Sequence, residues 1–248
     1  MFVRKSIGVI LCRMNKNVPE VLLIKKRCSY AFCEFVQGKL FTSTNQFDKM
    51  TRDEMCDILT LDFDIIWNRY SPNNSKYINI KRELFKKYLK DNGKKITNLI
   101  ISTQKKVDLM WECPKGSQHK LEDEITCAIR ELKEETGIDK KDYTIVGNLN
   151  KYTSHVSNKT LYKVKYYVAY TDKKLNLYCK LEDYIKTNEI IDMKWFNILQ
   201  LIQMDLIKLT FNIAPMVRPI FNIIRKEYKK ARKNIIKEII EMHDKPKT

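Results

Sequence analysis

The feature that most restricts the fold is a 23-residue segment between Gly116 and Ile138, which reads GSQHKLEDEITCAIRELKEETGI. After its first glycine comes an apolar stripe at i, i+3, i+4 and i+7, the pattern of a helix with one face on a core: Ile125, Ala128, Ile129 and Leu132. Three carboxylates at i, i+3 and i+4 converge on a neighbouring face of the same helix: Glu131, Glu134 and Glu135. The segment therefore predicts a helix that gathers negative charge beside a core.

This clustering of carboxylates points to a metal ion. Like charges at such spacing destabilise a helix by about 0.2–0.5 kcal/mol per pair, a cost that a divalent cation would remove. Carboxylate oxygens suit Mg²⁺ or Mn²⁺, and Mg²⁺ is typically held together with substrate phosphates. The alternative is a solvated Glu/Lys helix face, and four further residues in register argue against it: Gly116, Glu122, Arg130 and Gly137.

Each of these residues has an expected role. A backbone carbonyl at Lys115 or Gly116, just before the helix, can turn toward the metal. Glu122 is expected to open the helix, where negative charge complements the macrodipole, and it reaches Arg130 only by extending along two turns. Arg130 precedes Glu134 by four residues and is placed to fix its rotamer, while Gly137 suits a left-handed cap.

The segment resembles the Nudix box, with every defining position filled. The resemblance implies an α/β Nudix fold, an α/β/α sandwich, and metal-assisted attack of water on the pyrophosphate of a nucleoside diphosphate linked to another moiety. It implies that Glu134 and Glu135 are the core metal ligands, and that Glu131 is a third ligand or helps to activate water.

A further carboxylate outside the box is a candidate for the same site. Glu189 lies just before a predicted strand that contains Trp195, and Nudix domains commonly carry a glutamate in such a loop. The resemblance makes Glu189 a candidate ligand or general base. Glu182 and Asp183 are the alternatives, as is a surface role for Glu189.

Composition also predicts the kind of binding partner and the cellular compartment. The net charge of +17 suits a polyanion such as RNA, although a solubility surface or a coding bias toward lysine is the alternative. Seven scattered cysteines without a CxxC pair favour a reducing compartment, and no apolar run approaches the 18 residues of a membrane span. A cytoplasmic protein is expected.

The order of predicted elements suggests an interrupted domain. Two strands at 4–13 and 20–26 form a hairpin, and a third strand lies at 109–113. Between them, residues 36–107 read as helices, with DNG at 91–93 as a stop signal. Strands at 143–153, 159–171 and 190–196, a short helix at 197–207 and a long basic helix at 214–243 follow the box. We predict a discontinuous Nudix domain (1–35 and 108–248) with an inserted helical, RNA-binding subdomain (36–107).

The resemblance extends to the Nudix decapping proteins of large cytoplasmic DNA viruses. It is carried by KRCSYAFCEFV (26–36), TLDFDIIWNRY (60–70), DNGKKI (91–96), WECPKG (111–116) and TCAIRELKEETGI (126–138). It implies removal of the 5′ cap of mRNA in the cytoplasm of an infected host, with release of m7GDP and 5′-monophosphate RNA. It also implies diphosphoinositol polyphosphates as a second substrate class, and small nucleoside diphosphates are a further alternative.

These substrates predict different surfaces. RNA would follow basic residues of the insertion and of the tail: Lys81, Arg82, Lys86, Lys87, Lys94, Lys95, Arg225, Lys229, Lys230, Arg232 and Lys233. A methylated guanine favours aromatic walls, with five candidates that are otherwise core residues: Tyr30, Phe32, Phe35, Trp67 and Tyr77. A compact inositol pyrophosphate would need a tight cluster near the metal: Lys25, Lys26, Arg27, Lys115 and Lys120.

Two other interpretations stay open at this point. A binding module that has kept the fold and lost catalysis usually loses glutamates of the box, which this chain retains. The apolar stripe of the tail is expected to stay buried on the domain, at Ile220, Ile223, Ile224 and Tyr228 and then Ile235, Ile236 and Ile239, or to serve as a dimer seam.

Overall fold

The structure is a computed structural model in which residues 2–39, 41, 43–70, 77–104, 107–157, 160–175, 177, 190–204 and 213–243 are described. Its strands are β1 (Phe2–Asn15), β2 (Val18–Lys26), β3 (Trp111–Glu112), β4 (Lys115–Gly116), β5 (Thr144–Ser157), β6 (Thr160–Thr171) and β7 (Ile190–Asn197). They form one mixed sheet in the order β3-β2-β1-β6-β5, in which β4 pairs with β1 and β7 pairs with β2. β1 runs parallel to β6 and antiparallel to β2 and β4.

The hairpin predicted near the N-terminus is confirmed. β1 and β2 are joined by Lys16 and Asn17, which have φ angles of 47° and 68°. Positive φ at both central residues is the conformation of a type I′ turn, whose twist matches that of the flanking strands. The predicted strands at 143–153, 159–171 and 190–196 are confirmed as β5, β6 and β7.

Alternation along β1 supplies the two faces of the sheet with apolar side chains. Ile7, Val9 and Leu11 pack toward α6 (Glu124–Thr136), together with Cys127, Ala128 and Leu132 of that helix. Ile10 and Cys12 alternate with these residues and belong to the other face, which packs on α8 (Ile198–Gln203) and α9 (Ile213–His243). Helices on both faces of one sheet make the predicted α/β/α sandwich.

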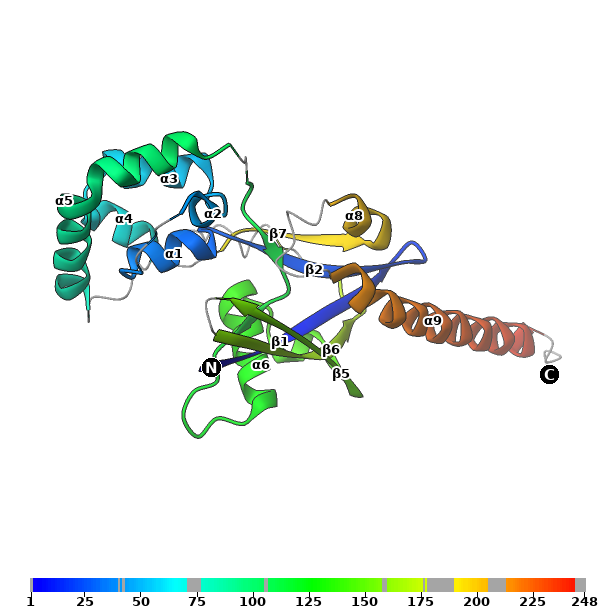
Figure 1. Cartoon of the computed structure of the whole chain (residues 1–248). Coiled ribbons are helices and arrows are strands. Elements are labelled where there is room, and N and C mark those ends of the chain that lie inside the picture. The colour runs from blue at the N-terminus through cyan, green and yellow to red at the C-terminus, as the bar shows by residue number, and fades with distance from the viewer. Residues whose placement is uncertain are drawn as a thin grey trace.

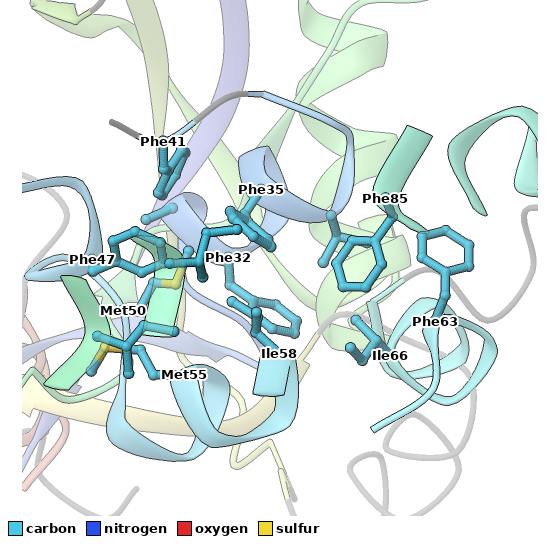
Figure 2. Close-up of a cluster of buried hydrophobic side chains, with 14 of the residues drawn as sticks. Phe32, Phe35, Phe41, Phe47, Met50, Met55, Ile58, Phe63, Ile66 and Phe85 are labelled. Atoms are coloured by element: carbon cyan, nitrogen blue, oxygen red, sulfur yellow. The ribbon is translucent and has the colours of Figure 1, made fainter. Parts of the chain in front are cut away.

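Five further helices lie together beside this sandwich (Figure 1), in the part of the chain between β2 and β3. We call these five the helical group: α1 (Tyr30–Val36), α2 (Thr44–Phe47), α3 (Arg52–Thr60), α4 (Phe63–Tyr70) and α5 (Ile78–Ser102). Their buried side chains form a core of their own, which is rich in phenylalanine (Figure 2). The boundaries of 36–107 stay a prediction, and this core also includes Ala31, Phe32 and Phe35 of α1.

The predicted stop at DNG is wrong, because α5 continues from Ile78 to Ser102 through residues 91–93. Phe85, Ile96 and Ile100 are buried on both sides of the glycine, so packing of one face outweighs a local cost of about 1 kcal/mol for Gly93. Figure 1 shows the helix changing direction partway along its length. Within α5 the Asn92 amide donates to the Tyr88 carbonyl, and such a side-chain bond competes with the helical ladder.

The predicted tail helix is confirmed as α9, but its buried face is shorter than expected. Val217, Ile220 and Phe221 are buried against the sheet, whereas Ile223 and Tyr228 are exposed. The helix leaves the sandwich and extends away from it (Figure 1), and among the described side chains the last of its stripe to pack on the core is Ile224. The side chains of Ile235, Ile236 and Ile239 lie outside the described part of the chain.

In the part of the chain that the structure describes, no helix combines the length and the apolar character that crossing a membrane requires.

Candidate active site

The box segment folds into α6 and its flanking turns. Asp123 is the N-cap, and its carboxylate accepts from the backbone N–H groups of Ile125 at 3.0 Å and Thr126 at 2.9 Å. Gly137 ends the helix with a φ of 67°, the left-handed region that glycine adopts without strain. These caps fix the length of the helix and therefore the positions of its carboxylates.

The predicted apolar stripe of α6 is partly wrong. Ala128 and Leu132 are buried with Cys127, but Ile125 is 40% exposed and Ile129 is only partly buried. The helix presents its smaller side chains to the sheet, so it lies close to β1 and β4. Close approach brings the adjoining carboxylate face toward the edge of β4.

Arg130 is the centre of a hydrogen-bond network on α6. Its Nε donates to Glu122 Oε1 at 2.8 Å and its Nη2 donates to Glu122 Oε2 at 3.0 Å, which is bidentate. Its Nη1 donates to Glu131 at 2.9 Å and to Glu134 at 2.7 Å. One guanidinium therefore orients three carboxylates of the box.

Glu122 does not open the helix, since it lies one residue before the N-cap Asp123. Its loop turns back at Leu121, which has a φ of 70°, and so it meets Arg130 without extending along two helical turns. Hydrogen bonds from Arg130 hold the pKa of Glu122 at about 2. Glu122 is thus a permanent anion that anchors Arg130.

Gly116 lies directly against the Glu131 carboxylate. A Cβ at this position would lie 2.1 Å from the Glu131 Cδ and Oε2 atoms. Only glycine allows this contact, so the carboxylate sits over the backbone of β4, next to the carbonyl groups expected near the metal. Burial raises the pKa of Glu131, and Arg130 opposes this.

Glu135 joins a group that we call the buried ionic cluster, formed by Lys26, Tyr30, Glu112, Lys115 and Glu135. Glu135 accepts from Lys26 Nζ at 2.5 Å and from the Lys115 backbone N–H at 2.8 Å. Glu112 pairs with Lys115 Nζ at 2.8 Å and accepts from the Tyr30 hydroxyl at 2.8 Å. The Lys115 ammonium also donates to that hydroxyl at 2.8 Å.

The two carboxylates of this cluster differ in their electrostatics. Burial raises the pKa of Glu135 to about 7, with Lys26 opposing the shift and Glu112 adding to it. Burial acts on Glu112 as well, but the charges of Lys115 and Lys26 outweigh it and lower the pKa of that carboxyl. Glu112 is therefore charged and buried between two lysines, although it lies outside the box.

The donor set fits a hard divalent cation, because the box face and the adjacent backbone of β4 supply oxygen ligands only. Among the described residues, however, no three His, Cys, Asp or Glu side chains are close enough together to bind one metal ion. Arg130 draws Glu131 and Glu134 toward itself, while Lys26 draws Glu135 into the cluster. In this arrangement the three carboxylates of the box do not converge on one point.

The predicted phosphate-binding residues differ in their partners and burial. Lys25 pairs with Asp108 at 3.3 Å, and Arg27 is partly buried. Lys115 is only 9% exposed, and its ammonium points into the buried ionic cluster. Glu112 and Tyr30 thus bind two of its three N–H donors, and a phosphate role for Lys115 stays a prediction.

The predicted RNA-binding cations divide into bound and exposed groups. Lys81 donates to the Gln37 carbonyl at 2.6 Å, and Arg82 pairs with Asp64 at 2.7 Å. The other named cations of the two helices are exposed where their side chains are described: Lys86, Lys87, Lys94 and Lys95 on α5, and Arg225, Lys229, Lys230 and Lys233 on α9. The side chain of Arg232 lies outside the described part of the chain, as do Glu182, Asp183 and Glu189.

Three of the predicted cap walls are core residues instead. Phe32, Phe35 and Trp67 are buried in the helical core. Tyr30 and Tyr77 are about half exposed, at 47% and 49%. Only these two of the five aromatic candidates have ring surface available to a ligand.

Two features of the site were missed in the sequence. Glu112 carried a signal, since it is a lone carboxylate between Trp111 and Cys113 in an apolar strand. The second feature is a cavity of about 460 Å³ beside the start of α6, whose lining includes Lys5, Lys163, Lys165 and Glu124. Lys5 and Lys163 are directly paired across β1 and β6, so the cavity could not be recognised before the strands were aligned.

Comparison with known proteins agrees with this geometry. A NUDIX domain model matches residues 88–218, more than half of the chain. The chain belongs to the Nudix family, whose members act on pyrophosphate bonds.

Similarity to viral proteins extends beyond the matched domain. The chain is 36% identical over 243 residues to the mRNA-decapping protein g5R of African swine fever virus, covering 91% of this chain and 96% of that protein. A protein of Acanthamoeba polyphaga mimivirus is 27% identical over 215 residues, covering 73% of this chain and 59% of its own length. The resemblance to viral Nudix decapping proteins is therefore confirmed. Among solved structures, the match to a C. elegans Ap4A hydrolase covers 82% of this chain and 86% of that chain at 17% identity, with a TM-score of 0.41.

Proposed function

We propose that this chain is a metal-dependent hydrolase that removes the 5′ cap of mRNA, releasing m7GDP and leaving 5′-monophosphate RNA. The observation that carries the proposal is the complete carboxylate face of α6, oriented by Arg130, in a chain that aligns with viral g5R along 91% of its length. The name of that relative describes mRNA decapping, so capped mRNA is the proposed substrate class. An infected host's cytoplasm is the location that this substrate implies.

Glu131, Glu134 and Glu135 would hold Mg²⁺ or Mn²⁺, with a backbone carbonyl at Gly116. The ion, when bound, would lower the pKa of water and neutralise charge on the pyrophosphate. Arg130 keeps Glu131 and Glu134 within reach of one another, and Glu122 holds Arg130 in place. Glu131 or Glu189 would accept the proton of the attacking water, and Gly116 keeps space for the Glu131 carboxylate.

The RNA body would follow the exposed cations of α5 and α9, where Lys94, Lys95, Lys229 and Lys230 reach solvent. Phosphates bound there release counterions, which gives affinity without sequence preference. Tyr30 and Tyr77 are the aromatic side chains with exposed rings for a cap. A dimer through the exposed stripe of α9 stays a prediction.

A second substrate class is favoured by the cavity beside α6. Three lysines in its lining, Lys5, Lys163 and Lys165, make a compact cationic site of about 460 Å³. Lys165 is paired with Glu124 at 2.6 Å, and Lys5 directly opposes Lys163 in the sheet, a like-charge pair that an anion would relieve. This size and charge suit a small polyphosphate such as a diphosphoinositol polyphosphate.

The test is hydrolysis of cap-labelled RNA by the purified protein with Mg²⁺ or Mn²⁺, beside free cap analogue and diphosphoinositol polyphosphate. We expect m7GDP from RNA, inhibition by uncapped RNA, and a loss of about 100-fold or more in Glu134→Gln with RNA affinity nearly unchanged. Exposed Asp172→Asn, which lies outside α5, α6 and α9, is the control. Turnover of the small pyrophosphates alone would overturn the decapping assignment, and full activity of Glu134→Gln would overturn the metal site.

A further inference from the structure

The buried ionic cluster connects α6 to the helical group through residues outside the Nudix box. Its members come from five elements: Lys26 from β2, Tyr30 from α1, Glu112 from β3, Lys115 from β4 and Glu135 from α6. Glu112 is completely buried, and a buried charge is tolerated only when it is paired and hydrogen-bonded. The cluster contains two carboxylates and two ammonium groups, so its charges balance.

Lys26 links the two carboxylates of the cluster. Its Nζ lies 2.5 Å from Glu135 Oε1 and 3.8 Å from Glu112 Oε1. The side chain is largely buried, so Glu112 limits where the ammonium can lie. Lys115 binds the other oxygen of each carboxylate, because its ammonium pairs with Glu112 Oε2 and its backbone N–H donates to Glu135 Oε2.

Both oxygens of Glu135 thus have donors from residues that also pair with Glu112, one from the Lys26 ammonium and one from the Lys115 backbone. An ionised carboxylate has about four lone-pair sites, so two accepted hydrogen bonds leave sites for a metal ion. The orientation of Glu135 is then set before any ligand binds, through Lys26 and Lys115. Outer-shell partners of this kind determine ligand geometry in metal sites generally.

We propose that Glu112 is a positioning residue for the metal site, which holds Glu135 through Lys26 and Lys115, and that Tyr30 of α1 supports Glu112. The inference rests on the proposed role of Glu135 as a metal ligand. It assigns a function to the contact between the helical group and the sandwich, because Tyr30 is the member of the cluster that the first helix contributes.

Loss of the Glu112 charge would change the metal site in a defined direction. Without it, the ammonium groups of Lys26 and Lys115 are balanced by Glu135 alone. Both cations would then compete with a divalent ion for the same carboxylate, and the net positive charge of the cluster would repel the ion. Metal affinity falls as a result, whereas added metal restores occupancy.

The experiment measures Mn²⁺ binding to the full chain, without substrate, from the electron paramagnetic resonance signal of free Mn²⁺. We expect Glu112→Gln to weaken Mn²⁺ affinity by about tenfold or more, the usual effect of an outer-shell change. Tyr30→Phe keeps the ring and removes one hydroxyl, so about a threefold loss is expected, the equivalent of one hydrogen bond. Activity of Glu112→Gln on cap analogue should recover as Mn²⁺ is raised, which a merely misfolded variant would not do.

Two matched controls come from outside the cluster. Glu20→Gln removes a largely buried carboxylate paired with Arg13 at 2.7 Å, near the other end of β2 from Lys26. Tyr228→Phe removes a hydroxyl on α9. Both should bind Mn²⁺ as the unaltered chain does.

Unchanged Mn²⁺ affinity in folded Glu112→Gln would overturn the proposal. If that variant does not fold, Tyr30→Phe decides, and an affinity equal to that of Tyr228→Phe would overturn the proposal. Because substrate is absent, these outcomes differ from a failure of decapping. A chain that binds Mn²⁺ through Glu135 but does not cleave capped RNA would refute the proposed function and leave this inference intact.

Discussion

α6 and α5 are both charged helices with one apolar face, yet their charges have different surroundings. On α6, Arg130 contacts three carboxylates and Glu135 is enclosed by Lys26 and Lys115. On α5, Lys86, Lys87, Lys94 and Lys95 are exposed. Fixed partners define a geometry for chemistry, whereas solvated cations suit contact with a mobile polyanion.

The two helices also differ in what anchors them. α6 lies on the sheet through the small or aliphatic side chains of Cys127, Ala128 and Leu132. α5 is held by aromatic packing. The ring centroids of Phe85 in α5 and Phe35 in α1 lie 5.8 Å apart in an edge-to-face contact, and the centroid of Phe35 lies 5.3 Å from that of Phe41. Separate cores predict that the two regions can be damaged separately.

The largest effect is expected from Phe35→Ala in the helical core. The cavity should destabilise this part of the protein by about 3–5 kcal/mol, as for other buried phenylalanines. Hydrogen exchange should speed up in α1 to α5 and less in the sandwich, with RNA affinity falling more than turnover of a cap analogue. Leu84→Ala on the exposed side of α5 is the control. Equal acceleration throughout would show that the two cores unfold as one.

The next largest effect is expected from removing Arg130, which orients the carboxylates of the box. Arg130→Met should lower kcat/KM by about 10- to 100-fold, because Glu131 and Glu134 lose their common donor and Glu122 loses its partner. Steady-state kinetics with cap analogue measures this. Arg69→Met, which removes a surface ion pair with Asp57 in the helical group, serves as control and should leave kcat/KM unchanged. Similar losses in both variants would contradict the distinction between the helices.

A smaller effect is expected for exposed cations of α5. The double change of Lys94→Glu and Lys95→Glu should make RNA affinity less dependent on salt. The slope of log RNA affinity against log salt concentration should fall in magnitude by about one for each phosphate that the protein no longer neutralises. Filter binding of uncapped RNA over a salt series measures the slope. The control reverses two exposed lysines outside the helical group, Lys16 and Lys141. An unchanged slope would remove α5 from the RNA path.

The smallest effect is expected from Gly93→Ala, which should stabilise the protein where the other changes impair stability or function. Nothing lies within 4 Å of a Cβ built at Gly93, and alanine in a helix is favoured over glycine by about 0.5–1 kcal/mol. The melting temperature should rise slightly. Gly137→Ala, placed at a φ of 67°, should lower it. A lower melting temperature for Gly93→Ala would show that the change of direction in α5 requires glycine.

The sequence by itself determined the elements whose signals are local. The box helix, the hairpin of β1 and β2, the strands β5 to β7 and the tail helix follow from spacing, alternation and turn residues within a few positions. The contact of Arg130 with Glu134 is also local, since the two residues are four apart on one helix.

Only the tertiary structure decided which distant charges meet. Lys26 and Glu135 are 109 positions apart, and Tyr30 and Glu112 are 82 apart, so no periodicity relates them. The path of α5 through Gly93 and the early end of the buried face of α9 were likewise set by what packs on each helix. Propensity acts over neighbouring residues, whereas burial and ion pairing depend on the elements that the fold brings together, and that is why the buried ionic cluster was not visible in the sequence.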